Sequence, residues 1–124
     1  MKKLPDAEFE VMKAVWAHEP PVTTHMVMEK LGEKNWKAPT VMTLLSRLVE
    51  RGFLRTDKIG KERIYFPLVT KDEYLKFETG NFIRQYHGNS FLSLVNTLYG
   101  DRQLSDSDLR ELMNWLEEKK EKRK

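Results

Sequence analysis

Cysteine is absent from the 124-residue sequence, and histidine occurs only at His18, His25 and His87. The lack of cysteine excludes a disulfide-stabilised scaffold, thiol catalysis and cysteine-ligated metal sites. The histidines are too scattered to form a ligand cluster, so we expect no metal and no other cofactor. No uncharged run approaches the roughly 18 residues of a membrane helix, and the N-terminus lacks the apolar core of a signal peptide. We therefore expect a cytoplasmic protein with no membrane insertion.

The length predicts one domain, or a small domain with a short appendage. With 40% hydrophobic and 33% charged residues, the composition is globular. The whole net charge of +3 lies in residues 1–70, and residues 71–124 are neutral. Seven basic groups fall within residues 36–63: Lys37, Arg47, Arg51, Arg55, Lys58, Lys61 and Arg63. Such a local excess indicates a polyanionic partner, although a merely solvated face gives the same pattern.

Three helices are predicted in the first 52 residues. The first begins at Asp6 and ends before Pro20-Pro21, and the second is capped by Thr23 or Thr24 and ends at Gly32. The third runs from Pro39 to Gly52. Its apolar residues, at helical spacing, are Val41, Leu44, Leu45 and Leu48. Its opposite face carries Thr40, Thr43, Ser46, Arg47 and Glu50.

A change of period follows the third helix. Residues 53–67 partly alternate between apolar and polar on two arms around Gly60, which predicts a β-hairpin with basic groups near its tip. Three further helices are expected: one opened by the capping box Thr70–Glu73, one after Gly88, and one capped by Ser105. We expect the end of the chain, residues 119–124, to be frayed.

Helix, helix, helix and hairpin is the order of a winged helix-turn-helix, whose second motif helix lies in the DNA major groove. The predicted fold is therefore mainly α with a small β-wing, with a DNA-binding domain in residues 1–70. Residues 71–124 are too few for a strong core and too apolar for a solvated one, so they predict a helical dimerisation domain. Its predicted contact residues are Phe91, Leu92, Val95, Leu98, Tyr99, Leu109, Leu112, Met113 and Leu116.

The sequence resembles the bacterial penicillinase-repressor (BlaI/MecI) family of winged-helix repressors, to which copper-responsive CopY is related. The resemblance covers about residues 4–118. It rests on Asp6-Ala7-Glu8-x-Glu10-x-Met12 followed by Trp16, on Trp36 before Thr40-Val41-Met42-Thr43-Leu44-Leu45 with Arg47-Leu48 and Gly52, and on Gln103-Leu104-Ser105.

The resemblance implies a homodimeric repressor bound to a dyad-symmetric operator and released when a membrane sensor protease cuts the dimerisation domain. Thr40 to Thr43 match the family's base-reading positions, with Pro39 where members often carry lysine or another polar residue. The family's scissile Asn-Phe pair falls on Thr97-Leu98, with Asn96 one place earlier. That departure argues against cleavage by such a sensor, and the absence of CopY's cysteine motif argues against copper sensing.

The sequence thus predicts a non-enzymatic, homodimeric transcriptional repressor whose partner is an operator in double-stranded DNA. The predicted DNA-binding residues are Lys37, Thr40, Met42, Thr43, Ser46, Arg47, Arg55, Lys58, Lys61 and Arg63. Met42 fits a base contact or a packing role, and Trp16 and Trp36 fit packing. Two alternatives remain: a winged-helix module that docks on an acidic protein, and a ligand-gated regulator with an effector pocket in its helical tail.

Overall fold

The computed structural model describes residues 1–100 and 104–123, and Gln103 of the sequence match lies outside that range. The chain divides into two compact units, Met1–Gly80 and Asn81–Lys124. The boundary between the units falls inside the helix over residues 71–87, because the first turns of that helix pack into the N-terminal core. The division by function predicted at residue 70, DNA binding before it and dimerisation after it, stays a prediction.

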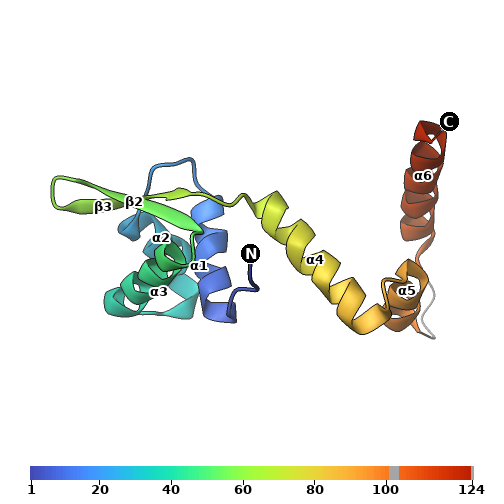
Figure 1. The fold of residues 1–124 in the computed structure, drawn as a ribbon, viewed down its shortest axis with the longest axis horizontal. Helices are drawn as coiled ribbons and strands as arrows, with labels where there is room; N and C mark the ends of the chain where they lie inside the picture. Colours follow the sequence, from blue (N-terminus) through green and yellow to red (C-terminus); the bar gives the residue numbers. More distant parts are fainter. Residues whose placement is uncertain (101–103, 124) are drawn as a thin grey trace. The chain divides into compact units, whose positions relative to one another are not determined.

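The N-terminal unit contains three helices and a three-stranded sheet (Figure 1). The predicted helices are confirmed as α1 (Asp6–Trp16), α2 (Thr24–Lys30) and α3 (Ala38–Glu50). Thr23 caps α2 by accepting a hydrogen bond from the backbone N–H of Met26. The predicted end of α2 at Gly32 is confirmed, since Leu31 is the C-cap of the helix, but Gly32 itself does not take the left-handed conformation. A 3₁₀ turn, Gly32–Lys34, follows Leu31, and Asn35 is the residue that takes the left-handed conformation.

The predicted hairpin is confirmed as β2 (Leu54–Ile59) and β3 (Glu62–Pro67), paired antiparallel around Gly60. Gly60 has φ +65°, a conformation that favours glycine, so the tight reversal suits this residue. The sequence pattern missed β1 (Val22–Thr23), which adds to β3 and gives the sheet order β1-β3-β2. Two residues are too few to show a period, so only pairing with β3 defines this strand.

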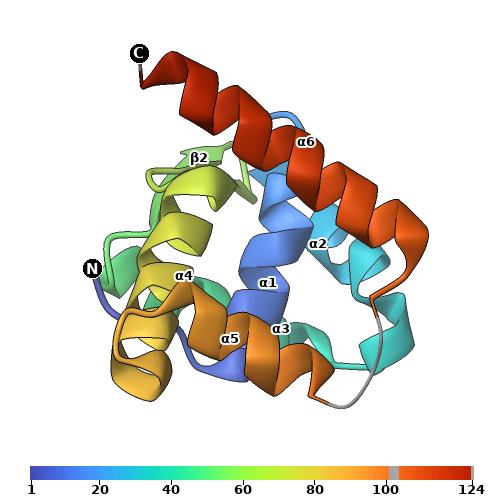
Figure 2. The ribbon, with the colours of Figure 1, turned by 90° about the vertical axis from the view of Figure 1, so that its right-hand side faces the viewer.

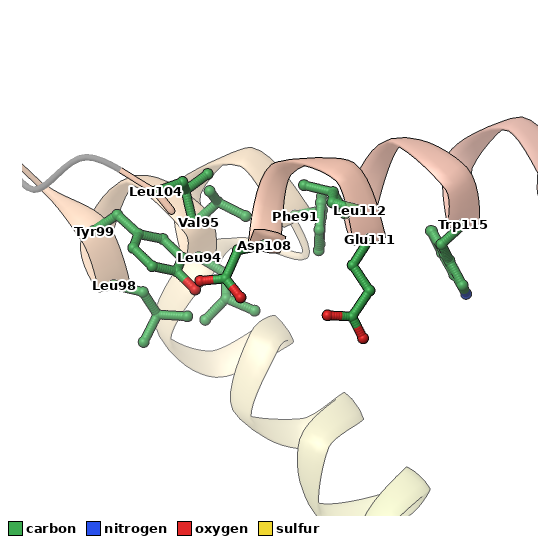
Figure 3. A pocket seen from close by; sticks show the side chains of 10 residues that line it. All are labelled: Phe91, Leu94, Val95, Leu98, Tyr99, Leu104, Asp108, Glu111, Leu112 and Trp115. Carbon is green, nitrogen blue, oxygen red and sulfur yellow. The ribbon is translucent and has the colours of Figure 1, made fainter. Parts of the chain in front are cut away.

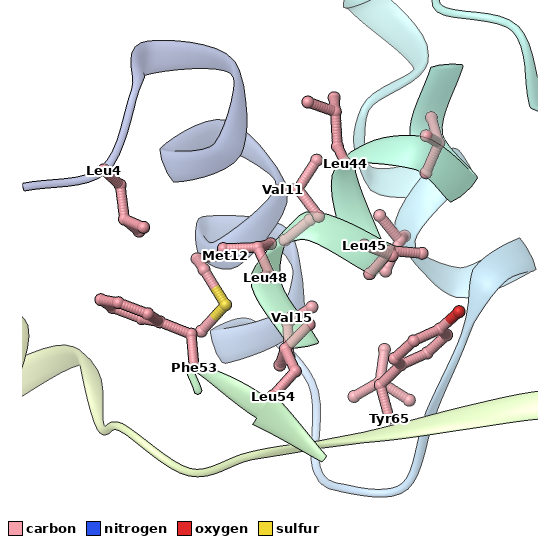
Figure 4. Packing of buried hydrophobic residues seen from close by; sticks show 14 of the residues in the cluster. Leu4, Val11, Met12, Val15, Leu44, Leu45, Leu48, Phe53, Leu54 and Tyr65 are labelled. Carbon is pink, nitrogen blue, oxygen red and sulfur yellow. The ribbon is translucent and has the colours of Figure 1, made fainter. Parts of the chain in front are cut away.

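The core of the unit is formed where α1, α3 and the start of β2 meet (Figure 4). Val11, Met12 and Val15 of α1 face Leu45 and Leu48 of α3, and all five are fully buried. Phe53 and Leu54 close the core beside the sheet. This packing fixes the inner side of α3, and therefore determines which of its residues face outward.

The helix α4 (Lys71–His87) begins with the predicted capping box: Thr70 accepts from the N–H of Glu73, and the Glu73 carboxylate accepts from the N–H of Thr70. Tyr74 is buried and lies against the rings of Phe9, Trp16 and Phe53. Its hydroxyl accepts a hydrogen bond from the backbone N–H of Leu4 at 2.7 Å. Burial raises the pKa of Tyr74. The first turns of α4 are thereby bound to the N-terminal core.

The C-terminal unit consists of the last turns of α4, then α5 (Phe91–Tyr99) and α6 (Asp106–Lys122) (Figure 2). Ser90 caps α5 and Ser105 caps α6 through their side-chain oxygens. The expected fraying from residue 119 is wrong, because α6 stays helical to Lys122. Lysines at that end suit the negative end of the helix dipole. Within the described residues, no helix is long and apolar enough to cross a membrane.

Candidate nucleic-acid interface

The helix α3 has one buried and one exposed face. Val41, Leu44, Leu45 and Leu48 are buried, as predicted. Pro39 lies in the first turn, where the missing N–H of proline costs no helical hydrogen bond. At the other end Gly52, with φ +80°, follows the helix and turns the chain toward β2. The sharp division between the faces leaves a continuous outward surface along the helix.

All predicted DNA-contacting residues of this helix lie on that outward surface. Thr40, Met42, Thr43, Ser46 and Arg47 are exposed, as is Lys37 just before the helix. Their side chains are therefore accessible from solvent. Whether they contact bases stays a prediction.

Thr43 lies in the middle of the exposed face, and its hydroxyl has a partner within the helix. The hydroxyl donates a hydrogen bond to the carbonyl oxygen of Pro39, one turn earlier, at 2.9 Å. Threonine in helices commonly makes this bond. Because the hydroxyl proton is engaged, Thr43 offers a ligand its methyl group and an acceptor oxygen rather than a donor.

The β2–β3 hairpin carries the second group of predicted contacts. Arg55, Lys58, Lys61 and Arg63 are all exposed. Lys58 and Arg63 are direct cross-strand partners, and like charges in such positions destabilise a sheet. The guanidinium of Arg55 lies over the ring of Phe66, 4.1 Å from its centroid. A row of phosphates would neutralise the repulsion, so the hairpin has the electrostatics of an anion-binding wing.

One basic residue of the predicted patch is committed elsewhere. Arg51, directly after α3, makes an ion pair with Glu8 of α1: its Nε lies 2.6 Å from Oε1 and its Nη2 3.4 Å from Oε2. Glu8 is only 2% exposed. Arg51 therefore holds the end of α3 against α1. Sequence reasoning missed this role, because the two residues are 43 positions apart and Glu8 fitted equally well as a helix-dipole residue.

The two tryptophans of the unit pack as predicted. Trp16 and Trp36 are half-buried and lie against the core. The indole N–H of Trp16 donates to the carbonyl oxygen of Val69 at 2.9 Å, which ties the segment before α4 to α1.

The C-terminal unit leaves its apolar side chains exposed or half-buried within the described residues. None of its described residues is buried. Exposed apolar side chains include Leu92, Leu98, Met113 and Leu116, four of the predicted dimerisation residues. Phe91 and Leu109 are also exposed, whereas Val95, Tyr99 and Leu112 are half-buried. Large exposed apolar patches on soluble proteins mark interaction surfaces.

A groove of about 420 Å³ lies between α5 and α6 (Figure 3). Five predicted dimerisation residues line it: Phe91, Val95, Leu98, Tyr99 and Leu112. Leu94, Leu104 and Trp115 line it as well and were not predicted. The carboxylates of Asp108 and Glu111 project from α6 at its side, so it is an apolar groove with an acidic margin. Trp115 lies three residues after Leu112, on the same side of the helix, and this spacing could have identified it from the sequence.

Comparison with known proteins decides the family. The profile described as penicillinase repressor matches residues 4–118. The chain belongs to the penicillinase repressor family. It is 32% identical to the penicillinase repressor of Bacillus licheniformis, over the whole of this chain and 99% of that one. It is 31% identical to the methicillin resistance regulatory protein MecI of Staphylococcus aureus (strain N315), over 94% of this chain and 95% of that one.

A solved structure supports the same assignment for the N-terminal unit. The solution structure of the DNA-binding domain of the repressor BlaI is similar to this chain with a TM-score of 0.50 and 36% identity. It covers 60% of this chain and 94% of the BlaI domain. The penicillinase repressor family is a family of transcriptional repressors and not of enzymes. The predicted family, the winged-helix fold and the non-enzymatic class are thus confirmed.

Proposed function

We propose that this penicillinase repressor family member is a homodimer that binds a pseudo-palindromic operator in double-stranded DNA through α3 and the β2–β3 hairpin. The observation that carries the proposal is the exposed face of α3. The side chains on this face, polar and apolar alike, are exposed, whereas the opposite face of α3 is buried in the core. In helix-turn-helix proteins, a helix in this position enters the major groove.

The two groups of residues have different tasks in this proposal. Thr40, Met42 and Thr43 contact base edges and supply sequence preference. Lys58, Lys61 and Arg63 of the hairpin contact phosphates, as do Arg55 and Lys37, and Ser46 and Arg47 extend these contacts along α3. Phosphate contacts release counterions, so they supply affinity that falls with salt and is the same for every sequence.

The exposed apolar side chains of the C-terminal unit support the proposed dimer. No residue of this unit is buried among those described, and a second copy that covers Leu92, Leu98, Met113 and Leu116 would supply a core. Two-fold dimers are the commonest oligomers. A two-fold dimer presents two copies of α3, and the half-sites are then about 10 bp, or a multiple of it, apart.

Release by a sensor protease would act on Thr97-Leu98. Both residues lie in the last turn of α5, and both are exposed. A protease needs extended backbone, so cleavage there requires the last turn of α5 to unwind. Because the pair is not Asn-Phe, we propose that the chain is cut slowly, or not at all, by a sensor protease of that specificity.

The groove between α5 and α6 favours one second candidate, a regulator controlled by a small apolar ligand. Its volume of about 420 Å³ is in the range of ligand pockets. A ligand that binds only the folded protein raises its melting temperature, and the rise grows with the logarithm of ligand concentration above the Kd. A screen of apolar and cationic compounds by thermal shift, repeated on Leu112→Asp, tests this candidate.

The proposed function is tested by fluorescence anisotropy with DNA from upstream of the protein's own gene and a scrambled duplex of equal length. Both are titrated with the full chain at two salt concentrations. We expect preference for the upstream DNA, with saturation at two chains per duplex. Equal and strongly salt-dependent binding to both would show a DNA-binding protein whose operator lies elsewhere. No binding at low salt would contradict the proposal and favour a module that docks on an acidic protein.

A further inference from the structure

The first two turns of α3 lack the side chains that usually read purines. Between Ala38 and Leu45 the sequence contains no Arg, Lys, Asn, Gln, Asp or Glu. Bidentate contacts from Arg or Lys to guanine, and from Asn or Gln to adenine, are therefore unavailable there. The exposed residues in this stretch are Pro39, Thr40, Met42 and Thr43. The chemistry that this part of the helix offers a base pair is largely apolar.

Met42 is the largest apolar group on this surface. Its side chain is 50% exposed, and it does not belong to the core cluster formed by the described residues. The packing role that the sequence left open is therefore not the one the structure favours. A thioether side chain is flexible and polarisable, which suits contact with a small apolar group of a ligand.

Thr43 presents an apolar group for a different reason. Its hydroxyl proton is given to the carbonyl oxygen of Pro39, so the side chain cannot donate to a base without breaking that bond. Its methyl group remains free on an exposed side chain. Met42 and Thr43 are consecutive residues of α3, and both are exposed.

The major groove offers one apolar feature on its base edges, the C5-methyl group of thymine. We infer that Met42 and Thr43 determine specificity by contacting thymine C5-methyl groups in each operator half-site. This inference rests on the proposed function, since it names the base chemistry that α3 reads. At the base pairs that Met42 and Thr43 contact, the operator preference of this chain would then depend on thymine methyl groups rather than on hydrogen bonds to purines.

Deoxyuridine differs from thymidine only in lacking the C5-methyl group, so it is the matched probe. The full chain is titrated with operator duplexes in which each thymine of a half-site is replaced in turn by deoxyuridine. Burial of one methyl group is worth ~0.8 kcal/mol, so we expect about fourfold weaker binding at each contacted position. Substitution of both half-sites is expected to weaken binding roughly 15-fold. Thymines outside the contacted positions are expected to show no effect.

The variants Met42→Ala and Thr43→Ser assign each methyl group to a residue. Thr43→Ser keeps the hydroxyl and removes only the methyl group. In a double-mutant cycle, each variant is expected to abolish the deoxyuridine effect at one position and to leave the other unchanged. Thr79→Ser, an exposed threonine of α4, is the matched control and is expected to retain both effects. Met42→Arg is expected to shift the preferred base toward guanine.

The outcomes separate this inference from the function on which it rests. A preference for the operator that is unchanged by deoxyuridine at every position of the half-site would overturn the thymine contacts alone. A deoxyuridine effect that persists unchanged in both variants would show that other residues make the contacts, and would also overturn the inference. Absence of any operator preference in the unmodified duplex would instead contradict the proposed function.

Discussion

Loss of the Arg51 side chain is expected to destabilise the N-terminal unit strongly, because it leaves the carboxylate of Glu8 unpaired in the core. Glu8 is 2% exposed, whereas the Arg51 side chain is 38% exposed. Breaking a fully buried ion pair costs about 3–5 kcal/mol. Since Arg51 is partly solvated, and water can reach the site it vacates, we expect about 2–3 kcal/mol for Arg51→Gln.

Urea unfolding followed by far-UV circular dichroism measures this loss. For a small domain the free energy of unfolding falls by about 1–3 kcal/mol per molar urea, so a loss of about 2–3 kcal/mol lowers the midpoint of Arg51→Gln by about 0.7–3 M relative to the wild type. Arg47→Gln is the matched control, an exposed arginine on the same helix. We expect its free energy of unfolding to change by less than about 0.5 kcal/mol. Equal midpoints for Arg51→Gln and the wild type would refute the argument that this ion pair holds α3 against α1.

Three further predictions concern the wing, the core and the dimer. Lys61→Ala is expected to weaken binding to all duplexes alike and to reduce by about one the slope of log affinity against log salt concentration, measured by anisotropy over a salt series. A loss that depends on the DNA sequence would contradict the phosphate role of Lys61. Tyr74→Phe leaves the buried N–H of Leu4 without its acceptor, so we expect the free energy of unfolding, measured in urea, to fall by about 1–3 kcal/mol. An unchanged free energy of unfolding would mean that water replaces the hydroxyl. Leu116→Asp is expected to convert a dimer to monomers in analytical ultracentrifugation, whereas Ser107→Asp, at an exposed position of the same helix, is the control. An unchanged mass for Leu116→Asp would place the interface elsewhere.

Local patterns carried most of the fold prediction. The apolar stripe of α3 is set by helical spacing within eight residues, and the turn at Gly60 by the conformation that its position demands. The caps of α2, α4 and α6 lie within three residues of the groups they bind. Such features are determined by neighbours in sequence, so the sequence alone reveals them.

The missed features depend on residues far apart in the chain. Glu8 and Arg51 are 43 positions apart, and Leu4 and Tyr74 are 70 apart. The strand β1 exists only because Val22 and Thr23 pair with Tyr65 and Ile64. No local period marks these contacts, because they arise when separately predicted elements pack together.

The candidate site shows the same division. Helical spacing placed Thr40, Thr43, Ser46 and Arg47 on the outer face of α3, since that face consists of the residues outside the apolar stripe. The hydrogen bond from Thr43 to Pro39 and the exposure of Met42 required the structure. Both observations favour contacts through apolar groups on this face.

Footprinting of the DNA upstream of the protein's own gene tests the central claim most directly. We predict a protected segment with two-fold symmetry, whose half-sites lie about 10 bp or a multiple of it apart. The same footprint is expected to be lost or moved with Thr43→Arg and to persist with Thr79→Ser. Protection of a single unsymmetrical segment, or a footprint that Thr43→Arg leaves unchanged, would contradict a dimeric repressor that reads its operator through α3.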